Sequence, residues 1–95
     1  MIRAIWNDTI LAEAEATETV EGNHYFPPGS VKSEHLRPSE HHTSCFWKGT
    51  ASYYDVVANG KTGTNLAWYY PDPKRKARHI ADHVAFYPQV TIAVD

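Results

Sequence analysis

Lys48 is the residue whose surroundings most suggest chemistry. It lies between Trp47 and Gly49, in a stretch from Cys45 to Tyr54 that also holds the only cysteine. A lysine near aromatic rings suits a contact with an anion or a cation–π interaction. The glycine beside it leaves room for close approach by a ligand or by another side chain. A lysine on the solvated surface is an equally good interpretation from composition alone.

Cysteine and histidine offer two weaker alternatives. His41 and His42 lie close to Cys45, and His79 and His83 are spaced like two metal ligands on one helix face. The sequence has neither a CxxC nor an HExxH pattern, so we predict no metal site and no cofactor. Cys45 with a nearby histidine could also act as a nucleophile. A cysteine just before a strand is, however, more often a small buried hydrophobic residue.

A β-hairpin is predicted to position this stretch. Residues 50–57 are rich in β-branched and aromatic side chains, which favours a strand. Asn59-Gly60 follows and favours a two-residue type I′ turn, after which residues 65–70 form the returning strand. With that turn, Ala51 would lie opposite Trp68.

Side chains alternate along a strand, so this hairpin should have two different faces. One face carries Trp47, Ala51, Tyr53, Leu66, Trp68 and Tyr70. We interpret the aromatic residues of this face as core. The other face carries Lys48, Thr50, Ser52, Tyr54, Ala67 and Tyr69. The assignment predicts that Lys48 lies among polar side chains and close to two tyrosines.

The rest of the chain predicts more short strands and one helix. Asn7-Asp8 is a second hairpin signal, and further strands are expected over residues 17–20, 84–87 and 89–94. Asp72-Pro73 is a typical helix start, with Asp as the N-cap and Pro at the first position. We therefore predict a mainly-β fold, a compact domain of short antiparallel strands and hairpins with one short helix near residues 73–82.

Two segments before the central hairpin carry weaker signals. Residues 30–36 could form a single helical turn capped by Ser30. Residues 37–44 contain Pro38 and several polar side chains, and we expect them to be irregular.

Length and charge exclude several classes of protein. Ninety-five residues predict a single domain spanning residues 1–95. A net charge of −2 provides no basic footprint for nucleic acid, and no apolar run approaches the roughly 18 residues needed to span a bilayer. The first six residues lack the apolar stretch of a signal peptide. We therefore expect a cytoplasmic protein with no nucleic-acid or membrane partner.

Several stretches are distinctive in combination. They are His24-Tyr25-Phe26-Pro27, Ser39, the run from Thr43 to Tyr54, Ala67-Trp68-Tyr69-Tyr70 and Val84-Ala85-Phe86-Tyr87. The pattern Cys-x-x-Lys-Gly-x-Ala-x-Tyr inside the long run is specific. Together these stretches, which extend over nearly the whole chain, resemble the family catalogued as domain of unknown function 427. The resemblance implies a compact mainly-β fold similar to the Mss4-like, or β-tent, architecture.

The resemblance does not by itself assign an activity. Classical members of that architecture carry zinc on two CxxC pairs, which are absent from this sequence. The family has been labelled a nucleotidyltransferase, but this chain has no Gly-Ser signature with paired metal-binding aspartates. Phe46 stands where many relatives have proline, which changes backbone stiffness before Trp47 rather than chemistry.

Three functions are compatible with these residues. The favoured hypothesis is that a small ligand, nucleotide-like or otherwise anionic, binds in an aromatic-walled cleft around Lys48. The candidate ligand-binding residues are Tyr25, Ser39, Thr43, Cys45, Trp47, Lys48, Tyr54 and Trp68. The second hypothesis is a transferase or hydrolase that uses Lys48 or Cys45 as its reactive group. The third is a protein-interaction module or a homodimer joined through exposed aromatic side chains.

Overall fold

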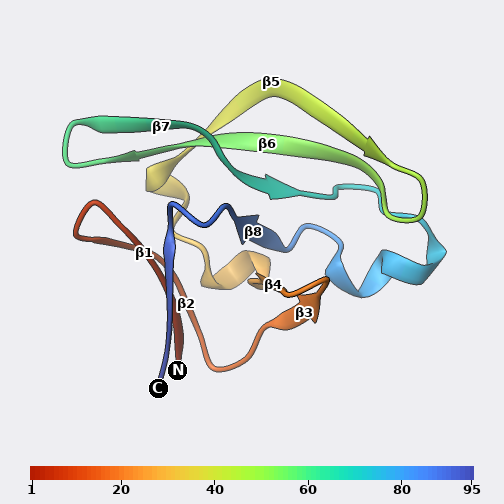
Figure 1. The fold of residues 1–95 in the computed structure, drawn as a ribbon, viewed down its shortest axis with the longest axis horizontal. Helices are drawn as coiled ribbons and strands as arrows, with labels where there is room; N and C mark the ends of the chain where they lie inside the picture. Colours follow the sequence, from red (N-terminus) through yellow and green to blue (C-terminus); the bar gives the residue numbers. More distant parts are fainter.

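A computed structural model describes all 95 residues, and antiparallel strands dominate it (Figure 1). One sheet has the order β2-β1-β9 and consists of β1 (Ile2–Trp6), β2 (Thr9–Ala14) and β9 (Thr91–Val94). A second has the order β5-β6-β7-β8 and consists of β5 (Leu36–Cys45), β6 (Gly49–Ala58), β7 (Lys61–Tyr69) and β8 (Val84–Phe86). The third is the hairpin of β3 (Glu18–Val20) and β4 (Asn23–Tyr25). The predicted mainly-β fold class is confirmed.

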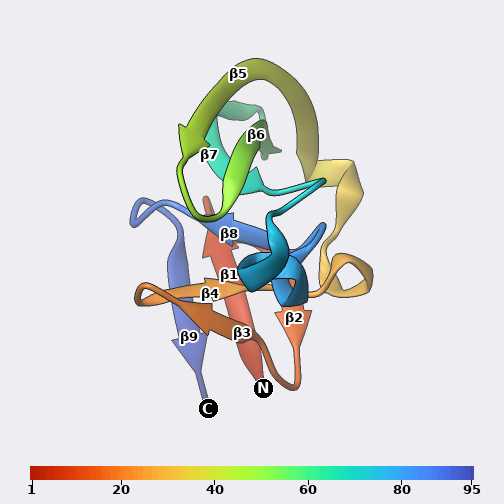
Figure 2. The ribbon, with the colours of Figure 1, turned by 90° about the vertical axis from the view of Figure 1, so that its right-hand side faces the viewer.

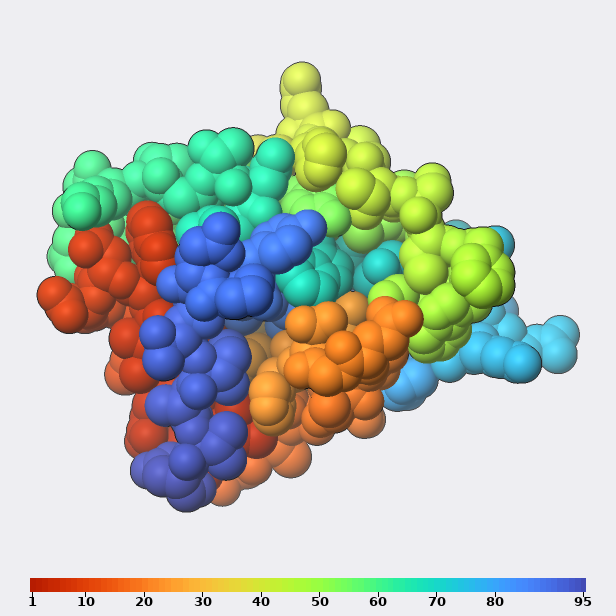
Figure 3. Space-filling model, viewed as in Figure 1, coloured from red at the N-terminus to blue at the C-terminus, as the bar shows by residue number.

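The three sheets are closely connected. Backbone hydrogen bonds in both directions between Phe26 and Val84 join the β3–β4 hairpin to β8. Figure 2 shows β5, β6 and β7 arching above the rest of the chain, with β8, β4 and the sheet of β1, β2 and β9 beneath them. On the face drawn in Figure 3, the β3–β4 hairpin (orange) lies against the turn between β5 and β6 (yellow-green). The contact between the β3–β4 hairpin and this turn determines which side chains surround Lys48.

Both predicted tight turns are confirmed, and the structure also joins them to each other. Asn7 and Asp8 connect β1 to β2, while Asn59 and Gly60 connect β6 to β7. All four residues have positive φ, as a type I′ turn requires. The side-chain amide of Asn59 donates to the Asn7 carbonyl at 2.8 Å, and that of Asn7 donates to the Ala58 carbonyl at 2.8 Å. The two hairpins are therefore held together at their tips.

The predicted register of the central hairpin holds only near its turn. Beyond Val56 and Gly63 the pairing shifts by two residues, so that Trp68 lies opposite Tyr53 rather than Ala51. The shift arises at a bulge around Asn65, which has φ 54° and donates its backbone N–H to the Asp55 carboxylate at 2.9 Å. Since a shift of two residues preserves the alternation of side chains, the paired residues lie on the predicted faces. Leu66 at the bulge is an exception, because it packs in the core with Val56 and Ala67 rather than on the face of Trp68.

The prediction that residues 37–44 are irregular is wrong, because they lie within the ten-residue strand β5. This strand is at the edge of its sheet, where Pro38 and exposed polar side chains are tolerated. Its pairing with β6 is interrupted between Pro38 and His42. That irregularity and the exposed polar side chains discourage pairing with another sheet edge.

The helical segments are three short 3₁₀-helices, η1 (Pro28–Ser30), η2 (Ser33–His35) and η3 (Arg75–Ile80). The helix expected near residues 73–82 is confirmed as η3, although its N-cap is Lys74 rather than Asp72. The single helical turn predicted over residues 30–36 corresponds to two short helices in the structure, η1 and η2. Ser30 does not cap a helix: its hydroxyl donates to the Pro27 carbonyl at the end of η1.

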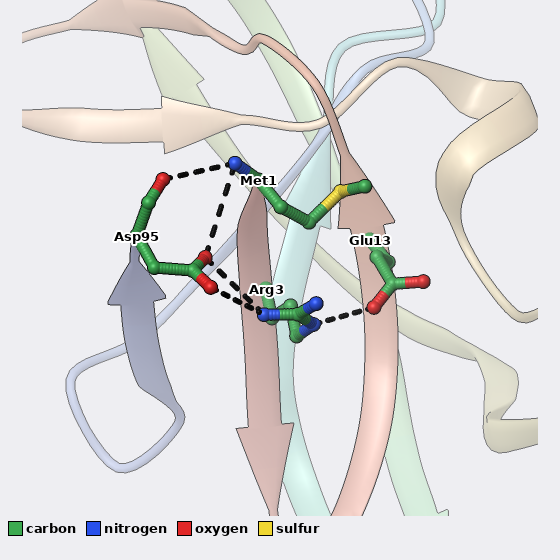
Figure 4. A network of polar contacts seen from close by, with 4 residues as sticks. All are labelled: Met1, Arg3, Glu13 and Asp95. Atoms are coloured by element: carbon green, nitrogen blue, oxygen red, sulfur yellow. Dashed lines mark hydrogen bonds and ion pairs between the residues drawn. The ribbon is translucent and has the colours of Figure 1, made fainter.

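The chain ends meet beside the three-stranded sheet (Figure 1). Arg3, on the central strand β1, donates to Glu13 of β2 at 2.5 Å and to the carboxylate oxygens of Asp95 at 3.2 and 3.3 Å (Figure 4). The Met1 amine donates to the backbone carbonyl of Asp95 at 3.0 Å. These contacts lie far from Lys48, which belongs to a separate aromatic part of the core.

Candidate functional site

Lys48 lies in the turn between β5 and β6 and points into the protein. Its side chain is only 9% exposed, so it is not a solvated surface lysine. The ammonium nitrogen is 5.4 Å from the centroid of the Trp47 ring and 5.6 Å from that of Tyr70. Its predicted position beside Tyr54 and Tyr69 is wrong, because Lys48 precedes β6 and does not follow the alternation of that strand.

Glu21 is the carboxylate partner of Lys48. It comes from the two-residue turn between β3 and β4, and the Lys48 ammonium donates a hydrogen bond to its carboxylate. Burial alone would lower the pKa of Lys48, but this hydrogen bond and the nearby Tyr25 and Tyr70 raise it above its usual value. The same hydrogen bond lowers the pKa of Glu21. The pair is therefore fully ionised at neutral pH, which disfavours Lys48 as a nucleophile or general base.

The aromatic part of the core surrounds this ion pair. Tyr25 is fully buried, and its hydroxyl accepts a hydrogen bond from the Trp68 indole at 3.1 Å. Trp68 also packs against Tyr87, with ring centroids 4.8 Å apart. Cys45 and Trp47 are half-buried against the same cluster. Five of the eight predicted site residues thus gather here: Tyr25, Cys45, Trp47, Lys48 and Trp68.

The space beside Gly49 is occupied by the chain itself. Gly49 has φ 112°, a conformation that other residues rarely adopt. A Cβ atom there would lie 3.4 Å from the carbonyl oxygen of Asp72, and the Lys74 amide donates to the Lys48 carbonyl at 2.9 Å. The backbone conformation is therefore what favours glycine here, since a Cβ atom would only touch the segment after β7 at ordinary van der Waals distance.

Ser39 and Thr43 lie apart from Lys48 on β5. The Ser39 hydroxyl donates to the side-chain oxygen of Asn65 at 2.5 Å and accepts from the His41 amide. The Thr43 hydroxyl is 3.0 Å from the Tyr53 hydroxyl. Both residues thus hydrogen-bond to the neighbouring strands, Ser39 at the bulge of β7 and Thr43 on β6.

The histidines form no metal centre with Cys45. No group of three His, Cys, Asp or Glu side chains is arranged to hold a metal ion. The His42 ring is 3.3 Å from the Ser52 hydroxyl, and the His83 ring contacts the Ala81 carbonyl at 2.9 Å.

The remaining predicted residue, Tyr54, lies on the opposite face of β6 and lines a separate pocket. Its ring stacks on that of Tyr69, with centroids 4.6 Å apart and an interplanar angle of 20°. The two rings form one wall of a cavity of about 350 Å³, which we call the Tyr54–Tyr69 pocket. Its apolar lining is completed by Pro28, Val31, Leu36 and Val84.

Two polar side chains complete this pocket, Ser33 from η2 and Asp82 from the segment after η3. Burial, followed by the neighbouring Tyr69 and Asp82, raises the pKa of Tyr54 to about 12. The tyrosine is therefore uncharged at neutral pH. Asp82 has φ 60°, and its backbone N–H donates to the Tyr70 carbonyl at 3.0 Å, which fixes the residue beside the pocket.

A second hollow, of about 460 Å³, lies near the other end of β6. It is lined by His42, Gly49, Thr50, Ser52, Pro71, Asp72 and Lys74. It lacks the apolar wall that most small-molecule sites have. Neither hollow is lined by Lys48.

Sequence reasoning missed several residues that matter in these sites. Glu21 is one of four acidic residues between positions 13 and 21, and nothing local distinguishes it from Glu18. Nothing in the sequence indicated that Asp82 lines a site, because its position beside Tyr54 depends on the path of the chain after β7. The aromatic character of residues 69 and 70 was visible, but only the structure separates them: Tyr70 faces Lys48 and Tyr69 faces Tyr54.

The fold and these side chains define a small antiparallel-β domain with a buried lysine paired to a half-exposed glutamate and an apolar pocket on its surface. The chain belongs to the family described as domain of unknown function (DUF427), whose sequence profile matches residues 1–95. This membership confirms the resemblance seen in the sequence. No curated protein matches the chain. None of its helices has the length and apolar character needed to cross a membrane.

Proposed function

We propose that this domain binds a small molecule in the Tyr54–Tyr69 pocket. The observation that carries the proposal is a largely apolar cavity of about 350 Å³, lined on one side by the stacked pair of tyrosine rings. Small-molecule sites are typically concave and mostly apolar, measure roughly 300–1,000 Å³ and contain a few polar groups. Ser33 and Asp82 are the polar groups here, so the pocket has the composition of such a site.

The pocket also differs from the core because its aromatic side chains remain partly exposed to solvent. Tyr54 and Tyr69 are both half-buried, although they pack against fully buried residues such as Val56 and Val84. A flat ligand would cover the part of the rings that remains exposed. It would thereby add apolar burial at about 25 cal/mol for each Å² removed from water.

The contact of a ligand with Lys48 stays a prediction. The ammonium lines no cavity and already has Glu21 as its partner, so an anionic ligand would first have to displace that carboxylate. We therefore favour the open pocket as the binding site and propose that Lys48 stabilises the β5–β6 turn. An enzymatic role for Lys48 or Cys45 has no specific support from geometry.

A fragment screen followed by NMR tests the proposed function. Aromatic fragments should shift the resonances of Val31, Leu36 and Val84, which line the pocket. Ser33→Trp should fill the cavity and abolish these shifts without unfolding the protein, because Ser33 is exposed. Ser44→Trp is the matched control, since Ser44 is exposed on β5 and lines neither hollow. Binding that survives Ser33→Trp, or no binding by any fragment, would contradict the proposal.

An interaction module is the second candidate function, and the exposure of Phe46 favours it. Phe46 is 89% exposed in the turn between β5 and β6, beside the half-buried Trp47. Together with the partly exposed Trp47, Phe46 provides aromatic surface of the kind that is enriched in protein interfaces. If the partner is a second copy of this chain, sedimentation equilibrium should detect a dimer that Phe46→Ser dissociates. A monomer at all concentrations would exclude the homodimer.

A further inference from the structure

We propose that the Tyr54–Tyr69 pocket prefers a flat cationic ligand, an amidine or a protonated aromatic amine, over a neutral or anionic one. This inference rests on the proposed function and specifies its ligand class. The expected charge of the ligand is opposite to the negative charge that Lys48 suggested. The reason is that the ion pair and the pocket lie on different faces of the sheet formed by β6 and β7.

The charges around the cavity carry the inference. Asp82 is the only one of the eight lining residues that is charged at neutral pH, and no Lys, Arg or His lines the cavity. An anion entering the pocket would meet a carboxylate and no compensating positive charge. A cation would gain a charge-assisted hydrogen bond to that carboxylate.

The tyrosine rings add a second reason. The face of an aromatic ring is the negative end of its quadrupole and attracts cations. Tyr54 and Tyr69 stack with centroids 4.6 Å apart and an interplanar angle of 20°, so each ring covers one face of the other and a ligand can stack only on an outer ring face. A planar cation could stack on that outer face while its edge faces Asp82. The Tyr54 hydroxyl is protonated at neutral pH, as that of any tyrosine is, and its raised pKa of about 12 extends this to alkaline pH.

The apolar residues limit the size and shape of the ligand. Leu36 and Val84 are buried core residues that also line the cavity. Pro28 and Val31, which line it as well, come from η1 and the residue after it. These side chains offer no hydrogen bonds. The polar groups of the ligand should therefore be confined to one edge, where Ser33 and Asp82 can bind them.

Three probes of the same size and shape test the charge preference: benzamidinium, benzamide and benzoate. NMR titrations at neutral pH and fixed ionic strength give the affinity of each for the native chain. We expect benzamidinium to bind roughly tenfold more tightly than benzamide, because a partly exposed charge-assisted hydrogen bond contributes at the lower end of its usual range. Benzoate should bind most weakly.

Asp82→Asn removes the charge with the least disturbance to the backbone, since asparagine tolerates positive φ. Asp8→Asn is the matched control: Asp8 also has φ 60°, is exposed, and lies in the β1–β2 turn outside the pocket. The preference for benzamidinium should fall at least severalfold in Asp82→Asn and stay unchanged in Asp8→Asn. The heat-unfolding transition of each variant shows whether it is folded.

The outcomes separate this inference from the proposed function. If all three probes bind in the pocket with equal affinity, or if Asp82→Asn leaves the preference intact, the charge inference is overturned while the proposed function stands. If none of the three probes shifts the resonances of the pocket but other neutral fragments do, the charge inference is likewise overturned while the proposed function stands. If no fragment of any charge binds there, both proposals fail.

Discussion

Removing Glu21 should destabilise the protein more than removing the charge of its partner Lys48. The Lys48 side chain is 9% exposed, whereas that of Glu21 is 51% exposed. Glu21→Ala therefore leaves an ammonium group without its carboxylate in a site that water scarcely reaches. Lys48→Met retains the apolar stem against Trp47 and Tyr70 and leaves a carboxylate that is already half in water.

The expected magnitudes follow from these exposures. Leaving a buried hydrogen-bonding group without a partner costs about 1–3 kcal/mol, and more for a charged one. Because the rings of Trp47 and Tyr70 still surround the ammonium, we expect Glu21→Ala to cost about 2 kcal/mol. Lys48→Met should cost about 1 kcal/mol or less, since losing the ion pair and cation–π contacts is offset by no longer burying a charge. The double variant should resemble Lys48→Met.

Urea unfolding at pH 7 of the native chain, both single variants and the double variant measures these free energies. Glu18→Ala is the control, because Glu18 is an exposed glutamate of the same hairpin that forms no ion pair. It should change the free energy of unfolding by within about 0.5 kcal/mol. A larger loss for Lys48→Met than for Glu21→Ala, or additive losses in the double variant, would refute the reasoning.

The same ion pair predicts a dependence of stability on pH. The hydrogen bond from Lys48 lowers the pKa of Glu21 below its usual value of 4.5. A carboxylate whose pKa is lower in the folded state contributes stability above its unfolded pKa, and this contribution is lost as pH falls through the folded pKa. The difference in unfolding free energy between the native chain and Glu21→Ala should thus be constant at neutral pH and shrink below pH 4.5. A difference that grows on acidification would contradict the assignment.

Substitutions at three positions, Asn59, Gly63 and Asn65, test the backbone around the central hairpin, each by its free energy of unfolding. Asn65→Ala should cost about 1 kcal/mol more than Asn65→Gly, because φ at this bulge is 54°; equal costs would mean that the side-chain hydrogen bond dominates. Gly63→Ala should cost about 1–3 kcal/mol by overlapping Leu66, while Gly29→Ala, with no neighbour within 4 Å, should not destabilise the chain. Asn59→Asp keeps a residue that tolerates the turn but removes its donor amide, so a loss of about 1 kcal/mol is expected; no loss would mean that the hairpin tips are held by other contacts.

Local signals predicted the elements that depend on a few neighbouring residues. Asn7-Asp8 and Asn59-Gly60 require positive φ at adjacent positions, and this requirement can be read from two residues. The helix η3 was also predicted from Asp72-Pro73, although it begins three residues after Asp72 and has Lys74 as its N-cap. Strand β5 was missed because an edge strand accepts proline and polar side chains, which resemble those of a loop.

The candidate site was less predictable because its contacts join distant residues. Lys48 and Glu21 are 27 positions apart, and Asp82 reaches Tyr54 only because the chain returns after η3. The hairpin register likewise depended on the hydrogen bond from Asn65 to Asp55, which no alternation pattern contains. The sequence singled out the aromatic residues as a group, but their division between the core around Lys48 and the pocket required the three-dimensional path.

The most direct test of the proposed binding site is a structure of the protein with an aromatic fragment bound. We predict that the fragment stacks on Tyr54 and Tyr69, with its polar edge toward Asp82, and that the ion pair between Lys48 and Glu21 is unchanged. A fragment bound instead at Lys48, with Glu21 displaced from the ammonium, would contradict the account and return the binding site to the aromatic core around Lys48.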